Sequence, residues 1–284
     1  MSKKSGLVLE GGAMRGLFSA GVTDVFLEND ITFDGMVGVS AGAAFGCNFK
    51  SRQHGRALRY NLKYCRDSRY CSIRSLIKTG DLFGVDFCYR KLPFELDPFD
   101  VDTFRKNPME FYVVCTDLTT GKAAYYKCDD GAERDLEVFR ASASMPLVSR
   151  IVYKDGTPLL DGGIADSVPL KFFEDKGYEK NVVVLTRPAD YIKGENKALP
   201  LIKRALREYP AATEAMRVRH EVYNESVKYA ESAEKDGRVF IIRPPQKLPV
   251  GRLCKDPKKL HKVYNIGRET ALSCLDELKE FLKW

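Results

Sequence analysis

The feature that most constrains the fold is the segment Gly38-Val39-Ser40-Ala41-Gly42, a G-x-S-x-G pattern. It ends the apolar run Gly35 to Val39 and opens Ala41 to Phe49, a stretch of small and apolar residues. A serine at a tight strand-to-helix turn adopts a strained backbone conformation, and flanking glycines let the two elements approach closely. The pattern therefore predicts a strand, a turn and a helix that present the Ser40 hydroxyl at the carboxyl edge of a sheet. The pentapeptide alone also fits a turn that serves close packing and nothing else.

A second glycine-rich turn, Glu10-Gly11-Gly12-Ala13-Met14-Arg15-Gly16, lies between the first apolar run and the helical stretch Leu17 to Glu28. Such a loop can direct backbone N–H groups toward the oxygen of an acyl tetrahedral intermediate, or toward a dinucleotide pyrophosphate. The chain departs from the dinucleotide-binding pattern G-x-G-x-x-G at Ala13, and Glu10 would place a carboxylate beside the phosphates. We therefore expect an oxyanion loop and no bound nucleotide.

A third motif, Asp161-Gly162-Gly163, follows the apolar pair Leu159-Leu160. An aspartate at the end of a strand, followed by two glycines, can come close to a serine on a neighbouring strand. A simple Asp-Gly turn is the alternative when the motif is considered alone.

Taken in this order, the three motifs resemble the patatin-like phospholipase family, and the chain looks like a bacterial member. That family has a glycine-rich oxyanion loop followed by Arg-Gly, a G-x-S-x-G serine and a later D-G-G or D-G-A aspartate. The block Ala141 to Pro146 resembles the small-residue segment that the family carries before its aspartate. The resemblance covers roughly Leu7 to Leu185, and Ala13 departs from the glycine that many members carry there.

The resemblance implies a serine acyl hydrolase that cleaves carboxylic esters of lipids or phospholipids through an acyl-enzyme intermediate, an activity of the EC 3.1.1 type. The implied catalytic residues are Ser40 and Asp161, acting as a dyad without metal or cofactor. The other implied site residues are the oxyanion loop Gly11, Gly12, Ala13, Met14, Arg15 and Gly16, the nucleophile elbow Gly38, Val39, Ala41 and Gly42, and the turn Gly162 and Gly163. The alternative from another class is a non-catalytic lipid-surface or regulatory protein on the same fold.

The residue types agree with a dyad independently of the resemblance. The chain has three histidines, His54, His220 and His261, and none lies in a metal-binding motif. A Ser-Asp-His triad in that chain order would have to use His220 or His261, and both lie in charged helical segments. The eight cysteines form no C-x-x-C pair, so we expect no zinc site and no redox motif.

Apolar runs alternate with helical stretches in the first half of the chain, which predicts a three-layer α/β/α fold with a mainly parallel sheet. We expect a catalytic domain over residues 5–195 and a mostly helical C-terminal extension over 196–284 packed on it. Further expected elements are an antiparallel strand from Lys122 to Cys128, strands from Val182 to Leu185 and Val239 to Ile242, a helix from Ala205 to Glu234, and a helical tail after Pro257.

The net charge of +7 is concentrated in one segment, since Lys50 to Lys78 holds nine Lys and Arg residues and a single acid, Asp67. Interleaved tyrosines and leucines favour peripheral contact with an anionic membrane, with a solvated helix face as the alternative. No nucleic-acid motif accompanies the charge, so nucleic-acid binding is not expected. The sequence shows no signal peptide and no spanning helix, which predicts a cytoplasmic protein at the inner face of the membrane. It carries no information on oligomeric state.

Overall fold

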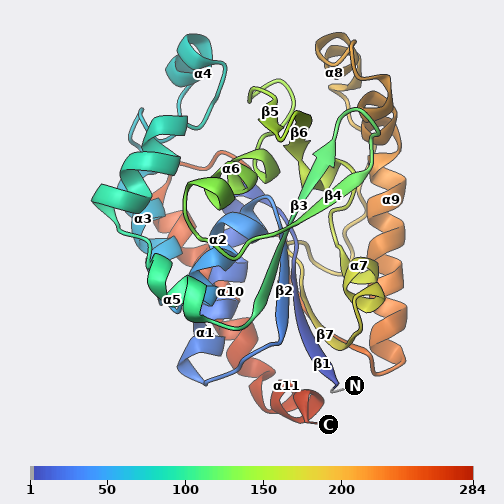
Figure 1. Ribbon diagram of the computed structural model, residues 1–284. Coiled ribbons are helices and arrows are strands. Elements are labelled where there is room, and N and C mark those ends of the chain that lie inside the picture. The colour runs from blue at the N-terminus through green and yellow to red at the C-terminus, as the bar shows by residue number, and fades with distance from the viewer. Residues whose placement is uncertain (1–2, 284) are drawn as a thin grey trace.

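The computed structural model describes residues 3–283, within which eight strands form a single mixed sheet (Figure 1). Met1, Ser2 and Trp284, at the expected N-terminus and at the end of the expected extension, lie outside the described residues. The strands are β1 (Lys4–Leu9), β2 (Gly35–Val39), β3 (Glu110–Asp117), β4 (Ala123–Lys127), β5 (Val152–Lys154), β6 (Thr157–Asp161), β7 (Tyr178–Val184) and β8 (Val239–Ile242).

The helices are α1 (Leu17–Glu28), α2 (Ala41–Lys50), α3 (Arg56–Tyr64), α4 (Ile73–Thr79), α5 (Val101–Lys106), α6 (Glu133–Ser142), α7 (Leu170–Asp175), α8 (Leu199–Ala205), α9 (Pro210–Lys235), α10 (Pro257–Ser273) and α11 (Leu275–Leu282). Short helical segments are η1 (Ala13–Gly16), η2 (Phe87–Leu96, a π-helix) and η3 (Gly162–Ile164).

The sheet has a parallel part, in the order β3-β2-β1-β7-β8, and an antiparallel edge. Strands β4 and β6 both run antiparallel to β3, and β5 runs antiparallel to β6. The predicted antiparallel partner of β3 is therefore present as β4, and two further antiparallel strands lie beside it. Strand β6 pairs with β3 only from Cys115 to Asp117, so its end at Asp161 lies opposite Cys115, still near the carboxyl end of β3.

Helices cover both faces of the sheet, which confirms the predicted three-layer α/β/α fold (Figure 1). Side chains of β1 alternate between the two faces, as the pleat of a strand requires. Leu7 and Leu9 join the apolar core formed with α1, α2 and α10, whereas Val8 joins the core formed with α7 and α9. The apolar runs that predicted these strands are thus buried on both faces, as is usual for parallel strands.

Residues beyond 195 take part in the same sheet and both helical layers. Strand β8 pairs in parallel with β7, and α9 packs against the face that includes Val8. On the other face, α10 lies against α1 at two glycines, where a Cβ on Gly21 would collide with the backbone of Tyr264 and one on Gly267 with that of Phe18. The helical C-terminal region is therefore confirmed, while the division at residues 195 and 196 stays a prediction.

Several element bounds agree with the sequence expectations. Helix α1 and strands β2 and β8 begin and end at the predicted residues, and helical segments follow Pro257. The expected helix from Ala205 to Glu234 is interrupted: α8 ends at Ala205, and α9 begins at Pro210. Proline lacks a backbone N–H and fixes φ, so it is tolerated in the first turn of a helix and disfavoured in the interior.

Candidate active site

Ser40 lies at the turn between β2 and α2, with backbone angles φ 54° and ψ −120°. Positive φ is unusual for a residue with a side chain, and such strain persists where packing holds the turn in place. A Cβ on Gly38 would lie 2.7 Å from the backbone nitrogen of Ala43, and one on Gly42 would collide with the carbonyl oxygen of Leu9. The two glycines therefore allow α2 to begin directly against the ends of β1 and β2.

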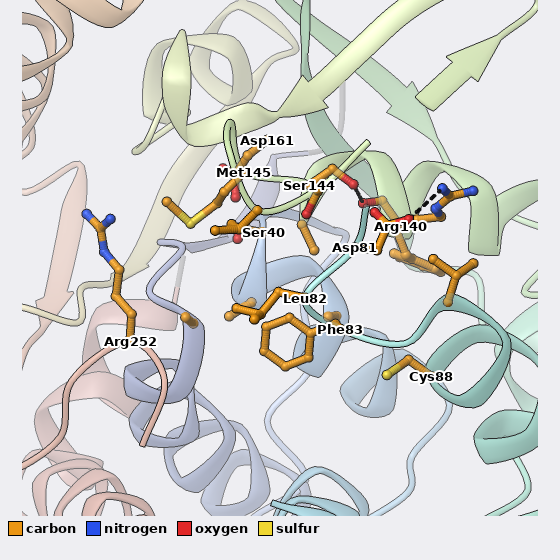
Figure 2. A pocket seen from close by; sticks show the side chains of 18 of the residues that line it. Ser40, Asp81, Leu82, Phe83, Cys88, Arg140, Ser144, Met145, Asp161 and Arg252 are labelled. Carbon is orange, nitrogen blue, oxygen red and sulfur yellow. Dashed lines mark hydrogen bonds and ion pairs between the residues drawn. The ribbon is translucent and has the colours of Figure 1, made fainter. Parts of the chain in front are cut away.

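Asp161 lies at the end of β6 and lines the same two cavities as Ser40. The carboxylate also accepts a hydrogen bond from the backbone N–H of Gly163, at 2.8 Å. Burial raises the pKa of Asp161, whereas the neighbouring Ser40 side chain and the charge of Arg219 oppose part of that rise. Figure 2 shows Ser40 and Asp161 together at the pocket, with Met145 beside them.

The two glycines after Asp161 are explained by close backbone contacts. A Cβ on Gly162 would collide with the carbonyl oxygen of Val114 in β3, so glycine is required for β6 to end there. Gly163 supplies the N–H that binds the Asp161 carboxylate. The structure therefore brings together Ser40 and Asp161, which lie 121 positions apart in the chain (161 − 40 = 121).

The backbone of Ser40 is held by Ser142, a residue that the sequence analysis did not single out for a role. Its hydroxyl accepts a hydrogen bond from the Ser40 N–H at 2.8 Å and donates one to the Val114 carbonyl at 2.6 Å. Ser142 is fully buried at the end of α6. The small side chains of the block Ala141 to Pro146 allow α6 to end close to the turn at Ser40, but they did not indicate which residue would contact it.

The predicted oxyanion loop, Gly11 to Gly16, passes beside Ser40, since a Cβ on Gly11 would lie 3.0 Å from the Ser40 Cβ. Ala13 has φ 48°, a left-handed conformation that glycine adopts more readily. Among the described residues, no protein acceptor is recorded for the backbone N–H groups of Gly11 and Gly12. Unpaired N–H groups close to a serine hydroxyl are the donors that an oxyanion needs.

The loop is anchored by Glu10 and Thr186. The Glu10 carboxylate accepts hydrogen bonds from the Thr186 N–H at 2.5 Å and from its hydroxyl at 3.1 Å, and the same hydroxyl lies 3.2 Å from the Gly11 carbonyl oxygen. Both side chains are buried. Thr186 follows β7, so the end of that strand sets the position of the loop.

Two cavities meet at Ser40. The larger, of about 400 Å³, falls within the usual range for small-molecule pockets and has a mainly apolar wall. Its lining includes Phe45, Tyr60, Tyr89, Leu92 and Phe139. Figure 2 shows Phe83, Ser40 and Asp161, which line the same cavity. The smaller cavity, of about 40 Å³, lies along the oxyanion loop and is lined by polar residues, among them Arg15, Lys193, Arg219 and Arg252.

None of the three histidines is among the described residues that line either cavity. His54 pairs with Glu28 at 2.5 Å, His220 lies 3.7 Å from Glu221, and His261 contacts Asn265 at 3.2 Å. Within residues 3–283, no group of three His, Cys, Asp or Glu side chains is placed to hold a metal ion. Of the described carboxylates that line these two cavities, Asp161 is the one that lines both, as Ser40 does.

Comparison with known proteins gives a family model described as "Patatin-like phospholipase" that matches residues 7–173, more than half of the chain. The chain belongs to the patatin-like phospholipase family. Membership supports a lipid hydrolase at the level of the family. A second model, described as a domain of unknown function (DUF6363), matches residues 209–283, which include α9 and α10.

Two similar proteins were found for this patatin-like chain. The uncharacterized protein YjjU of Escherichia coli strain K12 is 28% identical over 296 residues, which cover 94% of this chain and 72% of YjjU. The crystal structure of VipD from Legionella pneumophila superimposes with a TM-score of 0.49 and 13% identity, over 97% of this chain and 67% of VipD.

The basic segment Lys50 to Lys78 differs from its prediction in part. The Lys50 and Arg56 side chains are buried, each 4% exposed. The Lys50 ammonium binds the carbonyls of Asn107 and Met109, and Arg56 binds Asn48 at 2.9 Å. Neither side chain can touch a membrane, because both are used to join α2 and α3 to the loops around α5. No helix among the described residues is long and apolar enough to cross a bilayer.

Proposed function

We propose that this chain is a serine acyl hydrolase that cleaves a carboxylic ester of a lipid, with Ser40 as nucleophile and Asp161 as general base. The observation that supports it best is that Ser40 and the buried Asp161 carboxylate line the same two cavities, at the junction of an apolar cavity and a loop with unpaired N–H groups. A nucleophile, a base, oxyanion donors and a cavity for an acyl chain are the parts that ester hydrolysis requires.

In the first half of the reaction, the Asp161 carboxylate accepts the Ser40 proton while the Ser40 oxygen attacks the ester carbonyl carbon. The carbonyl oxygen becomes an oxyanion, which the loop N–H groups stabilise. The tetrahedral intermediate then collapses, and the departing alcohol takes the proton from Asp161. The acyl group remains on Ser40, with its chain in the apolar cavity.

In the second half, Asp161 accepts a proton from water as the water oxygen attacks the acyl carbon. The second oxyanion occupies the same loop, and its collapse returns the proton to Ser40 and releases the fatty acid. Burial raises the pKa of Asp161, which makes the ionised carboxylate a stronger base than an exposed aspartate.

A fluorophosphonate probe tests this function directly. We expect covalent phosphonylation of the intact protein by one equivalent of probe, mapped by peptide mass spectrometry to Ser40, because a base and oxyanion donors activate that hydroxyl. Ser144 lines the same large cavity and serves as the matched control, since Ser144→Ala should still be labelled whereas Ser40→Ala should not. Failure of Ser40 to react, with hydrolysis of no ester, would favour the non-catalytic lipid-surface protein on the same fold.

We also propose that α4 brings the enzyme to an anionic lipid surface. Ile73 and Ile77 are 71% and 80% exposed, and the cations Arg74 and Lys78 lie next to them in the chain. Figure 1 shows α4 projecting at the end of the molecule where the parallel strands have their carboxyl ends, which is also where Ser40 lies. Exposed isoleucines flanked by cations suit the boundary between acyl chains and anionic headgroups.

The double variant Ile73→Ser with Ile77→Ser should lower activity on anionic vesicles about a hundredfold at lipid concentrations below saturation, because each isoleucine loses an apolar contact worth about 1.5 kcal/mol or more. Activity on a soluble monomeric ester should stay within about twofold, since that substrate needs no surface. Leu272→Ser is the matched control, because Leu272 is 49% exposed on α10 rather than on α4. Equal losses on both substrates would contradict membrane contact through α4.

A further inference from the structure

The larger cavity extends away from Ser40 along helix α2. Residues of this helix line it from Ala41, next to Ser40, to Cys47, seven positions after the nucleophile (47 − 40 = 7), with Ala44 and Phe45 between them. An α-helix rises about 1.5 Å per residue, so the cavity follows α2 for roughly 10 Å. An acyl group attached to Ser40 can therefore lie alongside the first two turns of α2.

Three buried side chains form a wall at the far end of this part of the cavity. They are Arg56, Tyr60 and Phe99, which are 4%, 6% and 8% exposed, and all three line the cavity. Arg56 donates a hydrogen bond to Asn48, the residue after Cys47, at 2.9 Å, which places this wall at the second turn of α2. Because the three side chains are buried, the end wall separates the cavity from solvent there.

The end wall is held in place by contacts within the protein. The Arg56 guanidinium donates two further hydrogen bonds to the Asp97 carbonyl, at 3.1 and 2.6 Å, and lies 5.4 Å from the centre of the Tyr60 ring and 5.3 Å from that of Phe99. The Tyr60 ring in turn packs against Phe45 of α2, with the ring centres 6.3 Å apart. Moving the wall aside would break buried hydrogen bonds and leave packed rings without partners, so it sets a fixed limit.

The Tyr60 hydroxyl adds a second restriction on what can reach the wall. Within residues 3–283, no group of the protein forms a hydrogen bond with this hydroxyl. An acyl chain long enough to cover it would exclude water from it and leave a buried polar group unpaired, which costs free energy. Both the position of the wall and the chemistry of Tyr60 therefore disfavour a longer acyl chain.

The length of the cavity along α2 converts into a number of carbons. An extended backbone of single bonds advances about 1.2 Å per bond, so roughly 10 Å holds about eight bonds beyond the carbon that is attacked. We propose that Arg56, Tyr60 and Phe99 limit the acyl chain that this enzyme accepts, and that it prefers esters of acids with about eight to ten carbons. This assignment rests on the proposed acyl-hydrolase function, and it adds the chain length of the substrate.

A series of nitrophenyl esters from butanoate to tetradecanoate, at one fixed concentration of non-ionic detergent, measures the limit. The parent kcat/KM should rise by up to about fourfold per methylene until octanoate or decanoate, because each methylene is buried in the cavity. At dodecanoate it should fall at least about tenfold below the maximum, since the end of that acyl chain meets the wall. Values that keep rising through tetradecanoate would overturn the proposal.

Variants of Tyr60 test the wall itself. Tyr60→Phe keeps the ring and removes the hydroxyl, so the ratio of the dodecanoate to the octanoate kcat/KM should rise at least about fivefold. Tyr60→Ala also removes the ring, and the same ratio should rise at least about tenfold, because more methylenes can then be buried. If Tyr60→Ala does not fold, Tyr60→Phe decides. An unchanged ratio in every folded Tyr60 variant would overturn the proposal.

Tyr64→Phe is the control for these variants. Tyr64 lies one turn after Tyr60 on α3 and is also buried, at 7% exposed, but it is not among the residues that line either cavity. The variant removes the same group from the same helix and should leave the ratio of the two esters unchanged. A change as large as that of Tyr60→Phe would mean that general loosening of α3, rather than the end wall, controls the ratio.

Ala44→Leu tests the path along α2 in the opposite direction. Ala44 lines the cavity one helical turn after Ser40, so a larger side chain there should block the cavity about 6 Å from the nucleophile. The kcat/KM for octanoate should fall at least about tenfold more than that for butanoate, whose acyl chain ends before the block. Equal losses on both esters would show that the acyl chain does not follow α2.

A binding measurement separates the length limit from the hydrolase function. In calorimetry with Ser40→Ala, octanoate below its micelle concentration should bind more tightly than dodecanoate, and the further change Tyr60→Phe should reverse or reduce that difference. This result without hydrolysis of any ester would retain the limit and reject the proposed function. Hydrolysis in which dodecanoate and octanoate esters react alike, with no difference in binding, would retain the function and reject the limit.

Discussion

Ser40→Ala and Asp161→Asn are each expected to lower kcat for a short-chain nitrophenyl ester by about 10⁴-fold or more, because nucleophile and base act in the same steps. For the same reason, the double variant should be little worse than either single one. Near-normal turnover by Asp161→Asn would show that another group takes the Ser40 proton.

Stability provides the control for Asp161→Asn. Burial raises the pKa of Asp161, so the folded state binds more protons than the unfolded state above the ordinary aspartate pKa, and stability falls as the pH rises through that window. Asparagine carries no charge to bury. At pH 7 the melting temperature of the Asp161→Asn variant should therefore equal or exceed that of the parent protein. A loss of activity in this variant then cannot be assigned to unfolding.

The histidines provide a second control. His54→Ala, His220→Ala and His261→Ala should each keep most of the activity, since none of these side chains lines either cavity at Ser40. A loss of more than about a hundredfold in one folded variant would indicate a triad instead of a dyad.

The parts of the site that local sequence predicts are those made by consecutive residues. A strand, a turn and a helix around Ser40 follow from an apolar run, two glycines and a small-residue stretch, and the structure has all three. The same holds for the loop before α1, where Ala13 takes a left-handed conformation that glycine adopts more readily. Short-range sterics decide such elements, and they are visible in a single sequence.

Contacts between distant segments could not be predicted in the same way. Ser142 binds the backbone of Ser40 because α6 ends beside it, and nothing in the spacing of these two serines indicates that contact. Likewise, Arg15, Lys193, Arg219 and Arg252 reach one cavity from four separate segments. Each is one cation among the 46 Lys and Arg residues of the chain. Their convergence depends on the topology of the sheet.

For the basic segment Lys50 to Lys78, the sequence pattern was clear, but the prediction drawn from it was too simple. Nine cations between Lys50 and Lys78 predicted one charged surface, whereas the structure buries Lys50 and Arg56 and pairs some of the exposed cations with carboxylates. Arg59 pairs with Asp97 at 2.8 Å, and Arg69 with Asp67 at 2.7 Å. Composition shows how much charge is present, but burial and ion pairing decide how much of it can meet a membrane. The exposed isoleucines of α4 are therefore the better test of lipid contact.

Gly12→Val is expected to lower kcat by about 10²- to 10³-fold with a modest change in KM, because oxyanion donors act mainly in the transition state. A Cβ at Gly12 would lie 2.8 Å from the Thr186 hydroxyl and 3.3 Å from the Arg15 Cβ. The Thr186 hydroxyl is held by Glu10 and Gly11, so the loop, rather than Thr186, must move. Steady-state kinetics on a soluble neutral ester measures the effect.

The two kinetic constants separate this loss from other causes. A loop displaced from Ser40 still binds the acyl chain through the large cavity, so KM should stay within about threefold while kcat falls. The smaller Gly12→Ala change introduces the Cβ without the two methyl groups of valine, and should give an intermediate kcat at an unchanged melting temperature. If kcat were unchanged in both folded variants, the oxyanion would have to be stabilised elsewhere. The first N–H groups of α2, directly after Ser40, would then be the remaining donors, because a helix begins there with unpaired N–H groups.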